Sequence, residues 1–243
     1  HYESAEELFN ESTSYLQTTK GVWRNMAMIV FYNNLAVAEL RQEKFIEAEL
    51  TATKALEVAE LPEMQKKYKK LMGPPLSVMA AVRLHLGELE SSREYGEKAL
   101  ACYKIATNPP GYNNSTFNQA QIFCLLGLAL VEIKLNRDAK SLEYCNQVLA
   151  LIQDNYTGLT TLSLEWLNLL ANEYLNKKYF EQANALLDVA YLIGRENPFH
   201  PDAKKLLSYY EKLLLLTDKQ NEVSDMRAWL RHIESKNALS TTK

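Results

Sequence analysis

Four sets of residues, each spaced four apart, carry side chains suited to holding another polypeptide. Residues four apart lie on one side of an α-helix, so each set forms a row wherever its segment is helical. An asparagine amide donates and accepts hydrogen bonds at once, so it can hold a peptide backbone without reading its sequence. Apolar members such as Val37 and Leu128 would receive a partner's side chain. The sets are Asn33, Val37 and Arg41, with Asn34 beside them; Ser77, Ala81 and His85; Cys124, Leu128 and Glu132; and Asn168, Asn172 and Asn176.

The residues that most often perform catalysis are scattered along the chain. His85, His200 and His232 fall in different segments, and His1 begins the sequence. The sequence contains no H-E-x-x-H motif, no glycine-rich phosphate loop and no C-x-x-C pair. Cys124 and His85 could touch on neighbouring helices, but a buried thiol beside a surface histidine is the commoner arrangement. We therefore expect no enzymatic activity, no metal and no cofactor.

The charge balance argues against polyanionic partners. The chain has 243 residues, 27 Lys and Arg against 30 Asp and Glu, and a formal net charge of −3. This balance gives no general attraction to nucleic acid or to an anionic membrane surface. The one basic cluster, KKYKK at 66–70, fits a solvated helical face, with an acidic partner, a phosphate or RNA as the alternative. The partner predicted from these features is a protein or peptide segment, not a nucleic acid.

Three features bear on the compartment. The longest apolar stretch, 26–38, is interrupted by two asparagines and is too short to span a bilayer, so we expect no membrane insertion. The N-terminus lacks a charged start followed by an apolar block, so no signal peptide is visible. Cys102, Cys124 and Cys145 are odd in number and widely spaced, as is typical of reduced thiols. We expect a cytoplasmic protein, with the nucleus as the second possibility.

The stretch 32–58, YNNLAVAELRQEKFIEAELTATKALEV, has the pattern of two helices joined by a tight turn. Apolar residues recur at three- and four-residue steps on both sides of Glu43 and Lys44. The second half is rich in alanine, at Ala48, Ala52 and Ala55. A small side chain lets two helix backbones approach closely, so this stretch predicts a helical hairpin.

The same pattern returns along the chain at intervals of 40 to 49 residues. A repeat of this length predicts a solenoid, in which each hairpin buries its apolar face only against its neighbours. We therefore expect one all-α domain over 1–243, a right-handed α-solenoid of antiparallel hairpins. The repeat is marked by the small residue that opens each second helix, namely Ala5, Ala48, Ser92, Ser141, Ala183 and, least typical, Val223.

The expected elements follow from this alignment. Gly87 would end a first helix in the left-handed conformation, Gly73-Pro74-Pro75 would stop a helix, and the third hairpin's turn would be about two residues longer than the others. Because the chain begins in mid-repeat, we expect it to be a fragment of a longer protein. The predicted segments are a half repeat at 2–17, hairpins at about 22–60, 75–104, 116–151, 161–194 and 202–235, and a frayed tail at 236–243.

The pattern resembles the tetratricopeptide repeat, in which a bulky residue, Leu-Gly or Leu-Ala and an aromatic mark the first helix, and alanines and aromatics the second. The long period and the H-P-D start at 200–202 make the chain similar to kinesin light chain and the Leu-Gly-Asn-repeat adaptors. The resemblance covers nearly the whole chain; the last hairpin departs most, at Glu211 and Val223. The matching residues are Tyr32, Leu35, Ala36, Phe45, Ala48 and Ala55; Gly87 and Ala99; Phe123, Leu126 and Gly127; and Leu170, Ala171, Tyr174, Ala183 and Ala190.

This resemblance implies a non-catalytic adaptor that binds a peptide segment of a larger assembly in a concave groove lined by the first helices. The four rows would face that groove, and the partner segment would be mostly uncharged. Family members that clamp a terminal carboxylate use Lys, which is absent at the matching positions Asn33, Ser77, Cys124 and Asn168, so no such clamp is expected. The alternative is a structural subunit of a multiprotein complex that uses the convex face and the loop at 108–116, with no free groove.

Overall fold

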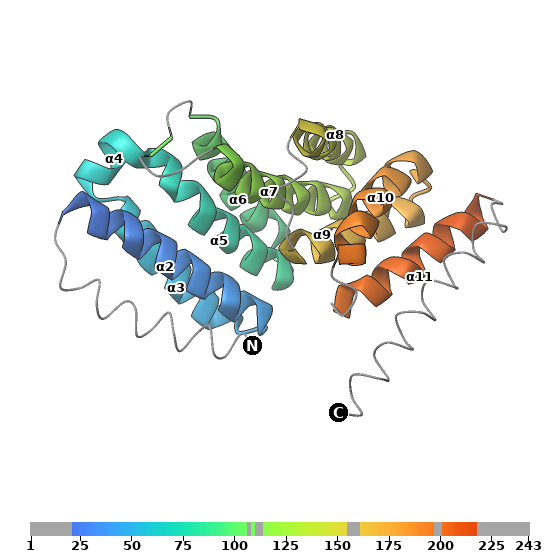
Figure 1. The fold of residues 1–243 in the computed structure, drawn as a ribbon, viewed down its shortest axis with the longest axis horizontal. Helices are drawn as coiled ribbons and strands as arrows, with labels where there is room; N and C mark the ends of the chain where they lie inside the picture. Colours follow the sequence, from blue (N-terminus) through green and yellow to red (C-terminus); the bar gives the residue numbers. More distant parts are fainter. Residues whose placement is uncertain (1–20, 106–107, 110–113, 155–160, 197–200, 218–243) are drawn as a thin grey trace. The chain divides into compact units, whose positions relative to one another are not determined.

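The computed structural model describes residues 21–105, 108–109, 114–154, 161–196 and 201–217, and most of them are helical (Figure 1). No strand occurs in these ranges, so the predicted all-α class is confirmed. A short 3-10 helix, η1 (Lys69–Met72), accompanies the α-helices. The α-helices are α2 (Val22–Arg41), α3 (Phe45–Ala59), α4 (Pro62–Tyr68), α5 (Gly73–His85), α6 (Leu89–Tyr103), α7 (Asn114–Lys134), α8 (Asp138–Asp154), α9 (Thr161–Asn176), α10 (Phe180–Glu196) and α11 (Pro201–Leu216).

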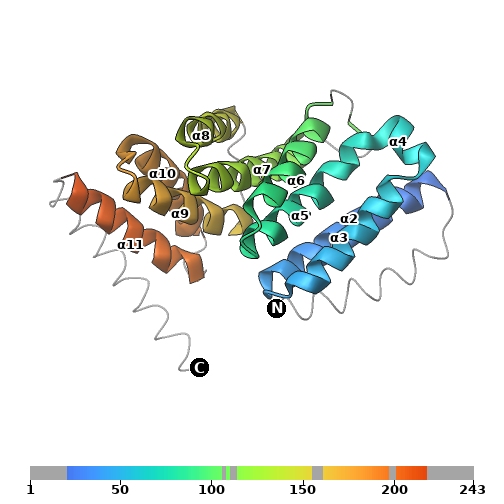
Figure 2. The same cartoon turned by 180° about the vertical axis from the view of Figure 1, so that it is seen from behind.

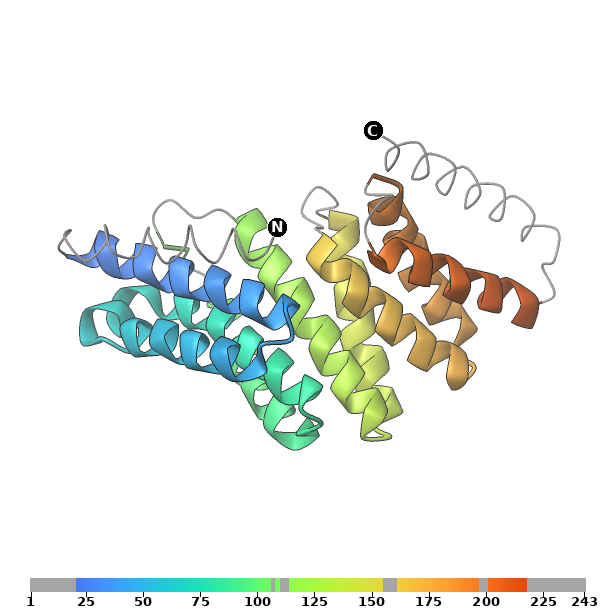
Figure 3. The same ribbon diagram turned by 90° about the horizontal axis from the view of Figure 1, so that it is seen from below.

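The chain divides into two compact units, His1–Arg137 and Asp138–Lys243. In the first unit α2 pairs with α3 and α5 pairs with α6, while α3 also packs on α5 and α6 on α7 (Figures 1 and 2). The first helices α2, α5 and α7 contact one another in turn. In the second unit α9 contacts α10 and α11, and α10 contacts α8 and α11 (Figure 3). Each helix therefore buries its apolar face against near neighbours in the chain.

One backbone turn recurs at the end of the first helices α2, α5, α7 and α9. A residue with positive φ, here called the turn residue, follows each helix, and the next N–H donates to the carbonyl five positions back, as Lys44 does to Glu39 at 3.0 Å. This is the Schellman arrangement, which satisfies the last free carbonyls of a helix. The left-handed conformation expected at Gly87 is confirmed. The turn residues are Glu43, Gly87, Asn136 and Lys178, with φ of 59°, 79°, 58° and 66°.

A small residue lies five positions after each turn residue and is packed inside its hairpin or against the next one. In α6 the Ser92 hydroxyl donates to the carbonyl of Ala80 on α5 at 2.7 Å. In the second unit the Ser141 hydroxyl lies 2.9 Å from the Tyr174 hydroxyl of α9. The predicted alignment of small residues is confirmed over this part of the chain: Ala48, Ser92, Ser141 and Ala183 are each at most 2% exposed.

One detail of the predicted turns is wrong. The turn after α7 is not longer than the others, because α8 begins two residues after Asn136, just as α3 begins two residues after Glu43. Gly73-Pro74-Pro75 follows the end of η1 at Met72, as predicted, and it also begins α5. Proline is tolerated in the first helical turn, where its missing N–H would have no intrahelical partner. The proline pair therefore marks the start of one helix as well as the end of the previous one.

Some predicted segments lie outside the described residues. These are the half repeat at 2–17, residues 110–113 of the 108–116 loop, the second helix of the last hairpin near 221–235 and the tail at 236–243. Residues 114–116, which were predicted to belong to that loop, begin α7. Trp23 is 67% exposed, so its side chain does not belong to the core of the first unit.

Candidate partner-binding surfaces

The row on α2 is the most accessible of the four. Asn34 is exposed, while Asn33, Val37 and Arg41 are half-buried. The Asn33 amide nitrogen donates to the Asn34 side-chain oxygen at 3.4 Å. The Asn33 side-chain oxygen accepts no hydrogen bond from the protein. This row therefore combines two amides, an apolar side chain and a cation that are at least partly accessible.

The row on α5 is mostly interior. Ser77 and Ala81 are each 4% exposed. The Ser77 hydroxyl lies 3.0 Å from the Tyr103 hydroxyl of α6 and donates to the Gly73 carbonyl at 3.0 Å. His85 is exposed, and its ring stacks on Phe45 of α3 with centroids 5.2 Å apart. Of this row, only His85 reaches a surface that a partner could touch.

The row on α7 faces α6 instead of a partner surface. Cys124 and Leu128 are 4% and 2% exposed, and the Cys124 thiol donates to the Gly96 carbonyl at 3.3 Å. A Cβ added to Gly96 would lie 2.7 Å from a Leu128 methyl, which shows how closely the two helices approach. This row was predicted wrongly because the turn after α7 was expected to be about two residues longer than it is. Asn33, Val37 and Arg41 lie ten, six and two positions before the turn residue of their hairpin. The residues at the same distances before Asn136 are Leu126, Leu130 and Lys134. A slip of two residues rotates the row by about 200°, to the opposite side of the helix.

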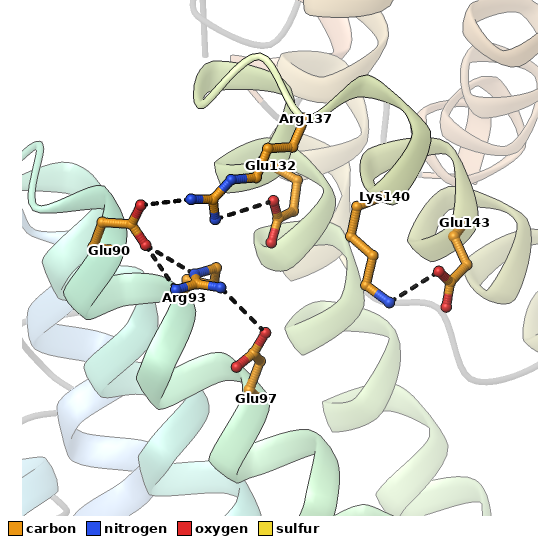
Figure 4. Close-up of polar contacts among 7 residues, drawn as sticks. All are labelled: Glu90, Arg93, Glu97, Glu132, Arg137, Lys140 and Glu143. Atoms are coloured by element: carbon orange, nitrogen blue, oxygen red, sulfur yellow. Dashed lines mark hydrogen bonds and ion pairs between the residues drawn. The ribbon is translucent and has the colours of Figure 1, made fainter.

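Glu132, the third member of that row, belongs to an ion-pair network between α6 and the end of α7 (Figure 4). Arg137 pairs with Glu90 at 2.9 Å and approaches Glu132 at 3.8 Å. Arg93 pairs with Glu90 at 2.9 Å and Glu97 at 3.8 Å. Glu132 is 2% exposed, and burial raises the pKa of its carboxyl although both guanidinium groups oppose this. In the second unit Figure 4 also shows the pair between Lys140 and Glu143 within α8.

The asparagine row on α9 contacts α11. Asn168 is 2% exposed, and its amide nitrogen donates to the Asp202 carbonyl at 2.9 Å. Asn172 and the exposed Asn176 each accept a hydrogen bond from the Lys212 ammonium, at 3.3 and 2.8 Å. Asn168 is therefore part of the interior, and the two others hold a lysine of the same chain. The expectation that Asn168 faces a partner is wrong.

Two side chains at these candidate surfaces, Lys134 and Lys212, were not among the residues predicted from the sequence, for identifiable reasons. Lys134 would have been found from Asn136, since asparagine tolerates the left-handed conformation and marks the end of a helix. Lys212 lies on α11, and the described part of that hairpin contains no turn residue from which to count. Within the basic cluster, Lys70 is 7% exposed, and its ammonium donates to Asn108 at 2.7 Å and lies 4.8 Å from the Phe117 ring. The fully solvated face expected at 66–70 is therefore wrong for Lys70.

The thiols are poor nucleophiles. All three cysteines are free and buried. Burial raises the pKa of Cys124 to about 12 and that of Cys145 to about 11. At neutral pH both are therefore thiols rather than the reactive thiolates. No group of three or more metal-binding side chains occurs in the part of the chain that the structure describes.

One described segment has the length and hydropathy of a membrane span. It is Phe117–Lys134 in α7, and 61% of it is buried inside the protein. The core helix of a helical domain gives the same signal, so the segment is weak evidence for a membrane span.

Comparison with known proteins gives matches in structure but not in sequence. No protein-family model and no curated sequence matches the chain. The structure is similar to the crystal structure of BtubC (BKLC) from P. vanneervenii, with a TM-score of 0.69 and 16% identity over 98% of this chain and 92% of that chain. It is also similar to the apo form of RapI, with a TM-score of 0.56 and 13% identity over 98% of this chain and 88% of that chain. With its recurring hairpins and turns, the chain has the fold of a tetratricopeptide-type helical solenoid.

Proposed function

We propose that this protein is a non-catalytic interaction scaffold that binds an extended segment of a partner protein across its first helices. The observation that carries this proposal is the surface of α2, where Asn33 and Asn34 stand beside Val37 and Arg41 and remain at least partly exposed. The two amides supply both donors and acceptors for a peptide backbone.

The test is a matched pair of variants. Peptides selected on an array of random 15-residue sequences would be titrated against the 243-residue chain by fluorescence anisotropy. Because each lost hydrogen bond contributes about 0.5–1.5 kcal/mol, the double variant Asn33→Ala, Asn34→Ala should weaken binding about tenfold. Asn146→Ala is the control, since Asn146 is an exposed amide on α8. Equal affinity of the double variant and the unmodified chain would rule out this surface.

A second function, that of a structural subunit, is favoured by a different observation. Ile46 and Leu50 lie one turn apart on α3 and are 72% and 59% exposed. An apolar pair on the outer helix of a hairpin fits a permanent protein contact better than a peptide-binding surface. An adaptor should be a monomer, whereas a subunit lacking its partner should self-associate. Light scattering of the unmodified chain and of the variant Ile46→Ser, Leu50→Ser distinguishes the two, because only a subunit should become less aggregated on substitution.

A further inference from the structure

The outer face of α3 carries a pair of large apolar side chains that the other described second helices lack. Ile46 and Leu50 lie three and seven positions after the turn residue Glu43, and they are 72% and 59% exposed. Two such side chains on adjacent turns of one helix form a small patch, which single exposed residues do not. The same two positions after the other turn residues hold only charged or small side chains, namely Glu90 and Glu94 on α6, Ala139 and Glu143 on α8, and Glu181 and Ala185 on α10.

Two opposite charges flank this apolar pair. Glu47 and Lys54 are exposed, and neither side chain makes an ion pair or a hydrogen bond within the part of the chain that the structure describes. They are seven residues apart, which is nearly two full turns, so they lie along almost the same side of α3. Leu50 lies between them in height and beside them on the exposed face. The neighbouring Glu49 is already paired with Arg83 of α5.

An antiparallel pair of α3 helices related by a two-fold axis matches both features at once. If the axis is level with the midpoint between residues 50 and 51, Leu50 faces Leu50 of the second copy. Glu47 lies as far before that midpoint as Lys54 lies after it, so each glutamate is level with the lysine of the other copy. Because a two-fold axis brings the same surface of both copies together, two such ion pairs form. Ile46 extends the apolar contact on the side of Leu50 away from these charges, and Glu57 lies beyond the start of the other α3.

We propose that α3 is the contact surface of a symmetric homodimer, in which a second copy of this chain covers Ile46 and Leu50. This inference rests on the second proposed function, because it names the partner of the same apolar pair. One helix from each copy buries less than the roughly 1,200 Å² of a standard interface, so the dimer is weak and forms at micromolar concentrations. The exposed face of α3 is not the face that packs on α2. The dimer therefore carries two copies of the row on α2.

Sedimentation velocity of the 243-residue chain over a range of micromolar concentrations tests the dimer. Two charge reversals, Lys54→Glu and Glu47→Lys, are measured singly, as an equimolar mixture and combined in one chain. Each single variant brings like charges together in its own homodimer, whereas the mixture and the double variant restore opposite charges. Lys98→Glu is the matched control, because Lys98 is exposed and occupies the position on α6 that Lys54 occupies on α3. Circular dichroism checks that each variant is folded.

We expect the unmodified chain to reach a defined dimer, and each single reversal to weaken dimerisation about tenfold, since two attractive pairs become repulsive. The mixture, the double variant and the control should dimerise about as tightly as the unmodified chain. Single reversals without effect, or a mixture that does not restore the dimer, would overturn the proposal. A chain that stays monomeric would overturn it together with the second proposed function. If association has no dimeric end point and only Ile46→Ser, Leu50→Ser reduces it, the dimer is wrong while the second proposed function stands.

Discussion

At the scale of single residues, the same amino acid has different roles according to the face of the helix on which it lies. Asn34 is exposed on α2, whereas Asn168 is buried between α9 and α11. Both were predicted to hold a partner, because an amide can donate and accept in either place. Burial is what distinguishes an amide that is accessible to a partner from one that already makes a hydrogen bond to the protein's own backbone.

Replacing Asn168 should therefore affect stability. Asn168→Ala removes the buried hydrogen bond that the Asn168 amide donates to the Asp202 carbonyl, which should lower the free energy of unfolding by about 0.5–1.5 kcal/mol. Asn176→Ala, at an exposed position, should change it by less than about 0.5 kcal/mol. Urea denaturation followed by circular dichroism measures both. Similar small changes in the two variants would contradict the burial of Asn168.

The carboxyl of Glu132 should make stability depend on pH. Burial raises its pKa above the ordinary value of 4.5, so its contribution to stability is fully present below pH 4.5 and is lost as the pH rises through the folded-state value. Compared with Glu132→Gln, the unmodified chain should therefore lose stability between pH 4 and pH 7. Urea denaturation at several pH values measures the difference.

At the scale of elements, two successive boundaries between hairpins carry oppositely charged residues at equivalent positions. Glu49 of α3 pairs with Arg83 of α5. At the equivalent positions of the next boundary the charges are exchanged: Arg93 of α6 lies close enough to Glu132 of α7 to lower the pKa of that carboxyl. Packing α3 on α7 would bring Glu49 and Glu132 together, and like charges disfavour that wrong pairing. The order of the hairpins is thus supported by polar contacts as well as by the apolar core.

The recurring turn gives a prediction at the same scale. Glu43 and Lys178 adopt a left-handed conformation that costs residues with a Cβ about 1–2 kcal/mol. Glu43→Gly and Lys178→Gly should therefore raise the free energy of unfolding by about 0.5–1 kcal/mol, net of the added freedom of the unfolded chain. Thermal and urea denaturation measure these changes. Gly87→Ala is the opposite control and should destabilise by about 1 kcal/mol, because φ is 79° there. A loss of stability in the first two variants would contradict the turn.

At the scale of the whole molecule, the chain has two compact units whose boundary falls between α7 and α8. Our prediction from the sequence is one continuous solenoid over 1–243, and it remains a prediction. In such a solenoid stability is shared between neighbouring hairpins. Hydrogen exchange in increasing urea provides the test. We expect amides of α5 and α6 to lose protection together with those of α9 and α10, whereas separate transitions would show two independent domains.

The sequence alone determined the helical hairpins, their approximate bounds and the small residues that open the second helices, because a helix period and a small contact residue are local properties. The predicted row on α2 is at least partly accessible in the structure, and its role in binding a partner stays a prediction. Only the tertiary structure decided which other rows remain exposed. Cys124 and Leu128 face α6 because the turn at Asn136 fixes the rotation of α7, and Asn168 is buried because α11 packs over it. A side chain's availability depends on which helix covers it, and that contact is made by residues more than 25 positions away in the chain.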